Sequence, residues 1–262
     1  MALLTDPANE LAQLAAQLTG TSNKVGWLHL ANKFSVDNYS TEFYALILTI
    51  AERADIVARA IQRCDWDNPQ KSSALEDIGG FKSAFTPGVL NQNWGPNSPG
   101  PRLMRDHGRV LTYMSATVRQ QVSYPQFTPE ERSELLLLIE QYVIDLENEK
   151  DLDSVVRGAI VESITRFRFA LEHLEWGGAN YTLEAFRELT GAYAWIRNED
   201  NFSAEFDSNA ALRGLLSLIR LAKEKIDSAQ AWADSGNSVY RAYNLATNVI
   251  TPLMITHQAT GS

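Results

Sequence analysis

Three residues in the sequence RFRFALEH carry side chains that could cleave a phosphodiester bond. They are Arg166, Arg168 and His173. A histidine exchanges a proton near neutral pH, so it can serve as a general acid or base. An arginine can stabilise the negative charge that builds up on phosphorus during the reaction. Together, the three residues would form a catalytic site that needs no metal ion.

The spacing of these residues resembles the Arg-x4–6-His signature of HEPN-type ribonucleases, which are small all-helical RNA-cutting domains. Four residues separate Arg168 from His173, six separate Arg166 from it, and Arg102 with His107 gives another match. The resemblance covers only these short segments. It implies a metal-independent ribonuclease with RNA as its partner.

Helical geometry supports a second interpretation of the same segment. On a regular helix Arg168 and His173 point about 140° apart, whereas Arg166 and His173 lie seven residues apart and share a flank. Glu162 precedes Arg166 by four residues and Glu172 follows Arg168 by four, a spacing that favours ion pairs along a helix. We therefore predict a salt-bridged helix flank, with the ribonuclease site as the alternative.

A second basic cluster follows a stretch rich in proline and glycine at residues 86–101. Arg102, Arg105 and Arg109 are spaced so that one helix face presents all three. Such a face could bind phosphate or a nucleotide, because guanidinium groups pair well with phosphate oxygens. The other interpretation is a solvated basic face on an otherwise acidic protein.

Partner binding could involve apolar residues that fall outside the clear helical stripes. Trp94 lies inside the Pro/Gly-rich stretch, and Val249 and Leu253 belong to an apolar run near the end of the chain. Exposed tryptophans often anchor protein interfaces. The same residues could instead pack into the protein's own core.

The motifs of most metal and nucleotide sites are missing from the sequence. No Glu-x-x-His pair suited to a di-iron bundle occurs, and HExxH, GxxxxGK[ST], GxSxG and GxGxxG are absent. Cys64 is the single cysteine, so an intrachain disulfide and a multi-cysteine zinc site are both excluded. We expect no metal and no cofactor.

Composition narrows the class of protein. The chain has 262 residues, of which 45% are hydrophobic, and its net charge is −9. This composition predicts a folded protein with a sizeable core. The acidic balance disfavours general DNA binding. The N-terminus lacks a signal-peptide pattern, and no apolar run is long enough to cross a membrane. We expect a cytoplasmic protein that does not enter membranes.

Helix start and stop signals recur along the chain. Asp6 followed by Pro7 is typical of a helix start, and Thr128 with Glu131 forms the pattern of a capping box. A central helix is predicted from about Ser40 to about Arg63, and a later helix is expected to stop at residues 177–178, both glycine.

Strand-type alternation is absent over any sustained length. We therefore predict an all-α, irregular multi-helix bundle of nine or ten helices in two lobes. Residues 1–85 would form an N-terminal helical lobe, 86–101 a Pro/Gly-rich loop and 102–262 a C-terminal helical bundle, all within one integrated fold.

The leading functional expectation is a bacterial protein-interaction or regulatory protein, such as an antitoxin, an immunity protein or a phage-defence accessory protein. Its partner would be another protein or a second copy of the chain. The alternatives are the HEPN-like ribonuclease and a nucleotide- or phosphate-sensing helical domain that uses the three arginines after the Pro/Gly-rich loop.

Overall fold

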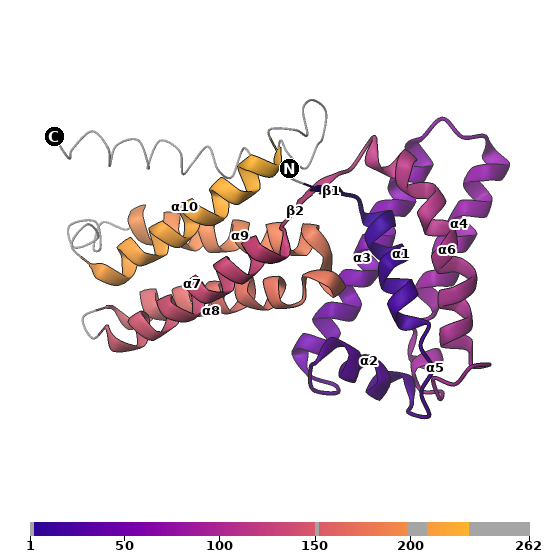
Figure 1. Cartoon of the computed structure of the whole chain (residues 1–262), viewed down its shortest axis with the longest axis horizontal. Coiled ribbons are helices and arrows are strands. Elements are labelled where there is room, and N and C mark those ends of the chain that lie inside the picture. The colour runs from indigo at the N-terminus through magenta and orange to yellow at the C-terminus, as the bar shows by residue number, and fades with distance from the viewer. Residues whose placement is uncertain (1–2, 150–151, 199–208, 231–262) are drawn as a thin grey trace. The chain divides into compact units, whose positions relative to one another are not determined.

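The computed structural model describes residues 3–149, 152–198 and 209–230, and it confirms the predicted all-α class. Within these residues the chain forms ten helices and two short strands (Figure 1). The first six helices are α1 (Pro7–Leu18), α2 (Gly26–Phe34), α3 (Thr41–Arg63), α4 (Asn68–Ser83), α5 (Pro87–Leu90) and α6 (Pro99–Arg119). The remaining helices are α7 (Pro129–Asn148), α8 (Ser154–Glu172), α9 (Leu174–Asn198) and α10 (Ala210–Gln230). The strands β1 (Leu3–Thr5) and β2 (Tyr124–Gln126) form a two-stranded sheet.

The chain divides into two compact units, and the division differs from the one predicted from the sequence. The N-terminal unit comprises Thr5–Tyr124 and Glu175–Gly178, so it holds α1 to α6. The C-terminal unit holds α7, α8, α10 and most of α9. Residues 86–101 therefore lie inside the N-terminal unit, because α6 returns to pack on α1, α3 and α4. The predicted loop also contains α5 and the first residues of α6.

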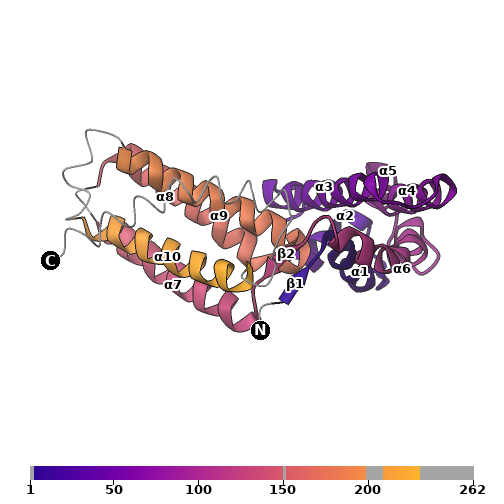
Figure 2. The same cartoon turned by 90° about the horizontal axis from the view of Figure 1, so that it is seen from above.

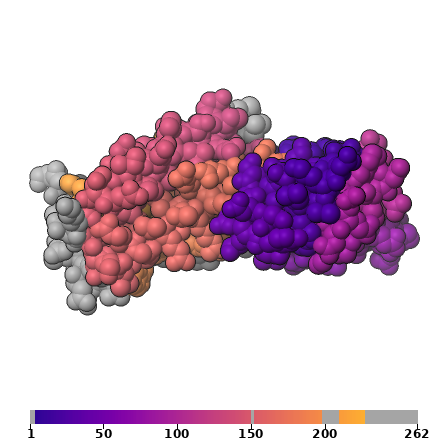
Figure 3. Space-filling view, turned by 90° about the horizontal axis from the view of Figure 1, so that it is seen from below, coloured from indigo at the N-terminus to yellow at the C-terminus, as the bar shows by residue number. Residues whose placement is uncertain are grey.

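The N-terminal unit is built from two layers, with α3 and α4 in one and α1 and α6 in the other (Figure 2). In the space-filling view, the indigo surface of the N-terminal residues lies beside the magenta surface of residues near 100–120, in the same unit (Figure 3). Asp6 caps α1 by accepting a hydrogen bond from the backbone N–H of Asn9, as its sequence context predicts. Its other carboxylate oxygen accepts from Ser115 Oγ at 2.7 Å and from Arg119, which ties α1 to α6.

Glycine at position 108 lets α1 and α6 approach closely. A Cβ atom added to Gly108 would lie 2.2 Å from the Cβ of Ala15, well inside van der Waals contact. Both residues are buried. The absence of a side chain at Gly108 therefore sets the separation of these two helices.

A buried arginine links three segments of the same unit. Arg53 on α3 is 1% exposed, and its guanidinium donates to Glu10 Oε2 at 2.9 Å and to the backbone oxygen of Trp176 at 2.7 Å. Burial lowers the pKa of Arg53, and the negative charge of Glu10 opposes that effect. Gly178 follows with φ of 82°, which breaks the helical path of α9. Its missing side chain leaves room for the ion pair, because a Cβ there would lie 2.5 Å from Glu10 Oε2.

In the C-terminal unit α7 packs on α8 and on α10, and buried apolar residues of α7, α8, α9 and α10 form the core. The predicted capping box at Thr128 and Glu131 is present at the start of α7. Arg132 on α7 donates to the backbone oxygen of Glu172 at 2.7 Å, and Arg157 on α8 donates to that of Leu146 at 2.6 Å. Each arginine thus satisfies a carbonyl at the C-terminal end of a neighbouring helix.

We expect Gly108→Ala to lower the free energy of unfolding by about 1–3 kcal/mol, because the new methyl group overlaps Ala15 and overpacks the interface between α1 and α6. Gly79→Ala is the matched control, since a Cβ at this helical position meets nothing within 4 Å. The control should stabilise the protein by up to about 1 kcal/mol. Urea titration of both variants measures the difference, and equal effects would contradict the packing argument.

Arg53→Met should destabilise the protein by about 3–5 kcal/mol, because it leaves the carboxylate of Glu10 in the interior without its arginine. The double variant Arg53→Met/Glu10→Leu removes both charges and should recover part of that loss. Urea titrations of the single and double variants test this order of stability. A single variant as stable as the wild type would show that the ion pair contributes little.

Candidate functional site

The three residues of the ribonuclease-like segment are engaged with separate partners. Arg166 forms an ion pair with Glu188 of α9 at 2.8 Å, and Arg168 forms one with Glu172 at 2.8 Å. His173 follows the last residue of α8, where its Nδ1 lies 2.9 Å from the backbone oxygen of Phe169. The expected ion pair between Arg168 and Glu172 is therefore present. The partner of Arg166 is Glu188, rather than the predicted Glu162, because α9 packs alongside α8, where Phe167 contacts Phe186, and so brings a carboxylate to Arg166.

This arrangement gives little support to a catalytic site at Arg166, Arg168 and His173. The His173 ring packs on Phe169 with centroids 4.2 Å apart and is 9% exposed. Among the described residues, no hydrogen bond or ion pair joins His173 to either arginine. The segment behaves as the salt-bridged helix flank that helical geometry predicts.

Trp94 is a core residue, which corrects its prediction as a partner-binding residue. Its side chain is fully buried, its Nε1 donates to the backbone oxygen of Leu18 at 3.1 Å, and its ring stacks on His29. Backbone hydrogen bonds with Ser22 and Lys24 also fix it. The prediction failed because these partners lie about 70 residues earlier in the chain. Val249 and Leu253, the other predicted partner-binding residues, lie outside the described residues.

The three arginines of the predicted phosphate site all lie exposed on α6. Arg105 and Arg109 line a groove of about 290 Å³ between α1 and α6, while Arg102 is not among the residues that line it. Within the described part of the chain, none of the three forms an ion pair with a carboxylate. The structure therefore brings two of the three predicted residues together.

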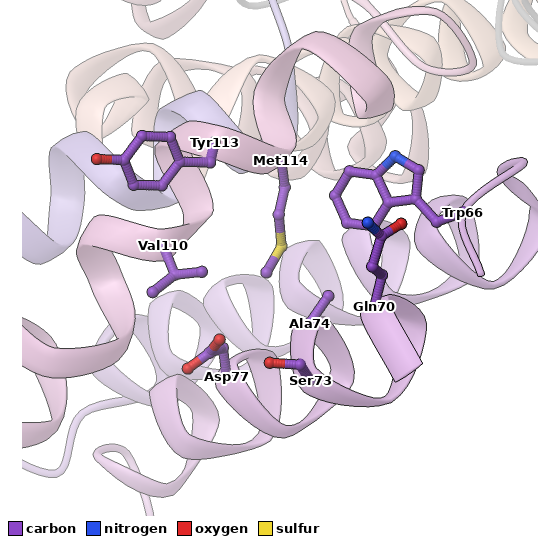
Figure 4. A pocket seen from close by; sticks show the side chains of 8 residues that line it. All are labelled: Trp66, Gln70, Ser73, Ala74, Asp77, Val110, Tyr113 and Met114. Atoms are coloured by element: carbon purple, nitrogen blue, oxygen red, sulfur yellow. The ribbon is translucent and has the colours of Figure 1, made fainter. Parts of the chain in front are cut away.

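A larger pocket lies on the other flank of α6, against α4. Its volume is about 480 Å³, and Figure 4 shows its lining side chains. Trp66, which follows α3, and Gln70 lie at one end, and Met114 of α6 points into the middle. Tyr113 stands at the rim and is 81% exposed, an unusual position for a large aromatic side chain. Aromatic and apolar groups thus form most of the pocket.

The polar groups of the pocket come mainly from α4. Ser73 and Asp77 point toward the pocket from successive turns (Figure 4). Asp77 Oδ1 lies 2.9 Å from Nδ1 of His107 on α6, so the carboxylate is anchored at one oxygen. Because α4 begins at an Asp67 cap that bonds to the N–H of Gln70, the local sequence fixes the register of these residues. A carboxylate beside aromatic walls suits a positively charged group.

Sequence reasoning did not identify Trp66, Asp77 or Tyr113 as site residues. One signal was available in the helical pattern: Tyr113 falls four residues after Arg109, on the polar face of an amphipathic helix. The pairing of α4 with α6, which closes the pocket, depends on tertiary contacts that no local pattern reveals.

No protein-family model, curated protein or solved structure matches this chain. In the described ranges, no helix combines the length and the apolar character needed to cross a membrane. No group of three or more histidine, cysteine, aspartate or glutamate side chains arranged to hold a metal ion occurs in the same residues.

Because His29 is buried, we expect the free energy of unfolding to depend on pH. Burial lowers the pKa of His29 below its ordinary value of 6.5, and Lys33 and Lys24 lower it further. Below that value the unfolded chain binds a proton that the folded chain excludes, so stability falls as the pH drops until the folded pKa is reached. His29→Phe keeps a ring against Trp94 and removes this contribution.

The measurement is the free energy of unfolding of the wild type and His29→Phe between about pH 7 and about pH 5. The wild type should lose more stability than the variant, by at most about 1.4 kcal/mol per pH unit. Parallel curves for the two proteins would show that His29 does not contribute.

Proposed function

We propose that this is a binding protein whose N-terminal unit receives a basic side chain of a partner protein in the pocket between α4 and α6. The observation that carries the proposal is the combination of Trp66, the exposed Tyr113 and the carboxylate of Asp77 around one pocket of about 480 Å³. Aromatic rings attract a lysine or arginine cation, and a carboxylate gives it a hydrogen-bonded partner.

The charge of the whole chain supports a basic partner. With a net charge of −9, the protein attracts cations over long distances and accelerates their encounter. Tyr113 has the character of an interface residue that contributes strongly to affinity, since tyrosine is enriched among such residues. The net negative charge of the chain and the aromatic and carboxylate groups of the α4–α6 pocket therefore both favour a basic partner.

The proposed biological setting is the bacterial cytoplasm, where an antitoxin, an immunity protein or a phage-defence accessory protein would act by binding a partner. Each of these roles needs a recognition surface and requires no chemistry from the chain. A HEPN-like ribonuclease has less support, because Arg166, Arg168 and His173 bond to separate partners.

The test compares the partners of the wild type with those of pocket variants. Tagged Tyr113→Ala and Asp77→Asn proteins, expressed in the native host, should lose a basic protein that the wild type retains, because each variant removes a group that contacts the cation. We expect a drop in affinity of about tenfold or more for each variant. Quantitative mass spectrometry and a titration with the identified partner measure it.

Two controls separate recognition from unfolding. Leu137→Ala alters a 66% exposed apolar residue of α7 and should leave binding unchanged. His107→Gln removes the histidine beside Asp77 but keeps the carboxylate, so it should retain most of the affinity. The proposal is wrong if both pocket variants retain the wild-type partners. Recovery of RNA that depends on Arg166 and His173 would instead favour the ribonuclease.

A further inference from the structure

The groove between α1 and α6 has a floor of small residues and walls that carry only cationic and hydroxyl groups. Ala12, Ala15 and Ala16 from α1 and Gly108 from α6 form the floor, together with Met104. Arg105, Arg109, Thr112 and Thr19 supply the polar groups. The groove exists because α1 and α6 are in close contact through the small residues Ala15 and Gly108. Longer side chains on both helices extend past this contact and form the walls.

The two arginines of the groove have no strong partner in the structure. Arg105 makes one long contact, 3.5 Å from the backbone oxygen of Pro96, and Arg109 makes no ion pair among the described residues. Guanidinium groups only donate hydrogen bonds, and the residues that line the groove offer them hydroxyl oxygens but no carboxylate. A ligand with anionic oxygens would supply such an acceptor.

The acidic residues of α1 and of its cap point away from the groove, and Asp106 of α6 is not among the residues that line it. Glu10 is the only acidic residue of α1, and it pairs with Arg53 in the interior. Asp6, which caps α1, pairs with Arg119 at the far end of α6. Arg105 and Arg109 thus line the groove without a carboxylate beside them in it.

We propose that this groove binds the phosphate of a small phosphomonoester, such as a nucleoside monophosphate. Arg105 and Arg109, one helical turn apart, hold the phosphate oxygens through charge-assisted hydrogen bonds. The apolar part of the ligand lies on the alanine and methionine floor. A volume of about 290 Å³ is at the lower end of the range for ligand pockets, which suits a ligand of this size.

This site is distinct from the proposed partner-binding pocket. The pocket uses Val110, Tyr113 and Met114 of α6, whereas the groove uses five other residues of that helix. Phosphate binding therefore does not depend on the partner-binding proposal, and either one can fail alone.

The experiment is isothermal titration of the full chain with adenosine monophosphate, inorganic phosphate and adenosine. The monophosphate should bind most tightly, inorganic phosphate more weakly, and adenosine too weakly to measure. Arg105→Gln/Arg109→Gln should weaken monophosphate binding at least tenfold. Arg105→Lys/Arg109→Lys should retain part of it, because lysine keeps the charge but lacks the planar fork.

Arg102→Gln is the matched control, since it removes a positive charge from the same helix outside the groove. It should change the dissociation constant less than twofold. Circular dichroism confirms that each variant is folded, and all three arginines are exposed, so their replacement leaves the core intact. The proposal is overturned if the monophosphate and phosphate both fail to bind at millimolar concentrations. It is also overturned if adenosine binds as well as its monophosphate, or if Arg102→Gln weakens binding as much as the double variant.

Discussion

The N-terminal unit depends on the buried ion pair between Arg53 and Glu10. An arginine in the interior needs acceptors for its donors, and here the backbone oxygen of Trp176 accepts from Nη1 and a carboxylate from α1 accepts from Nη2. The bond to Trp176 explains why the short segment Glu175–Gly178 belongs with α1 and α3, which precede it by more than 100 residues. The positive φ of Gly178 then allows the chain to leave this segment without a side chain striking the ion pair.

The same constraint determines how charge is distributed over α6. Fixing Glu10 toward Arg53 turns the only carboxylate of α1 inward, and Asp6 is committed to Arg119. On its α1 side the groove is lined by Ala12, Ala15, Ala16 and Thr19. Ala15 allows the close contact at Gly108, and none of the four gives Arg105 or Arg109 a carboxylate. The groove therefore has no carboxylate from α1, because the one that α1 carries pairs with Arg53 in the interior.

Local signals predicted the helices well, because caps, prolines and apolar stripes act within a few residues. Asp6 and Thr128 cap their helices as their sequence context indicates. The helix that was expected to stop at the glycines at 177–178 ends at Glu172, and Gly178 interrupts the following helix, α9. Burial, ion-pair partners and helix packing depended on tertiary contacts, which local patterns do not reveal. Trp94 is buried because it packs on Leu18 and His29, Arg166 pairs with Glu188 on the next helix, and α6 joins the earlier helices rather than the later ones. Of the candidate sites, the sequence identified the arginines of the groove, whereas the pocket at Asp77 and Tyr113 required the pairing of α4 with α6.

An acidic protein that carries a basic helix can bind ligands of both charges without conflict. The net charge of −9 acts at long range, where it favours cationic partners, but salt screens it over about 8 Å at physiological ionic strength. At shorter range the nearest groups decide the interaction. Helix α6 carries four arginines and one aspartate, and it places two of the arginines on the flank that faces away from Asp77. On its α4 side, α6 thus borders a pocket with the carboxylate of Asp77, and on its α1 side it offers the guanidinium groups of Arg105 and Arg109.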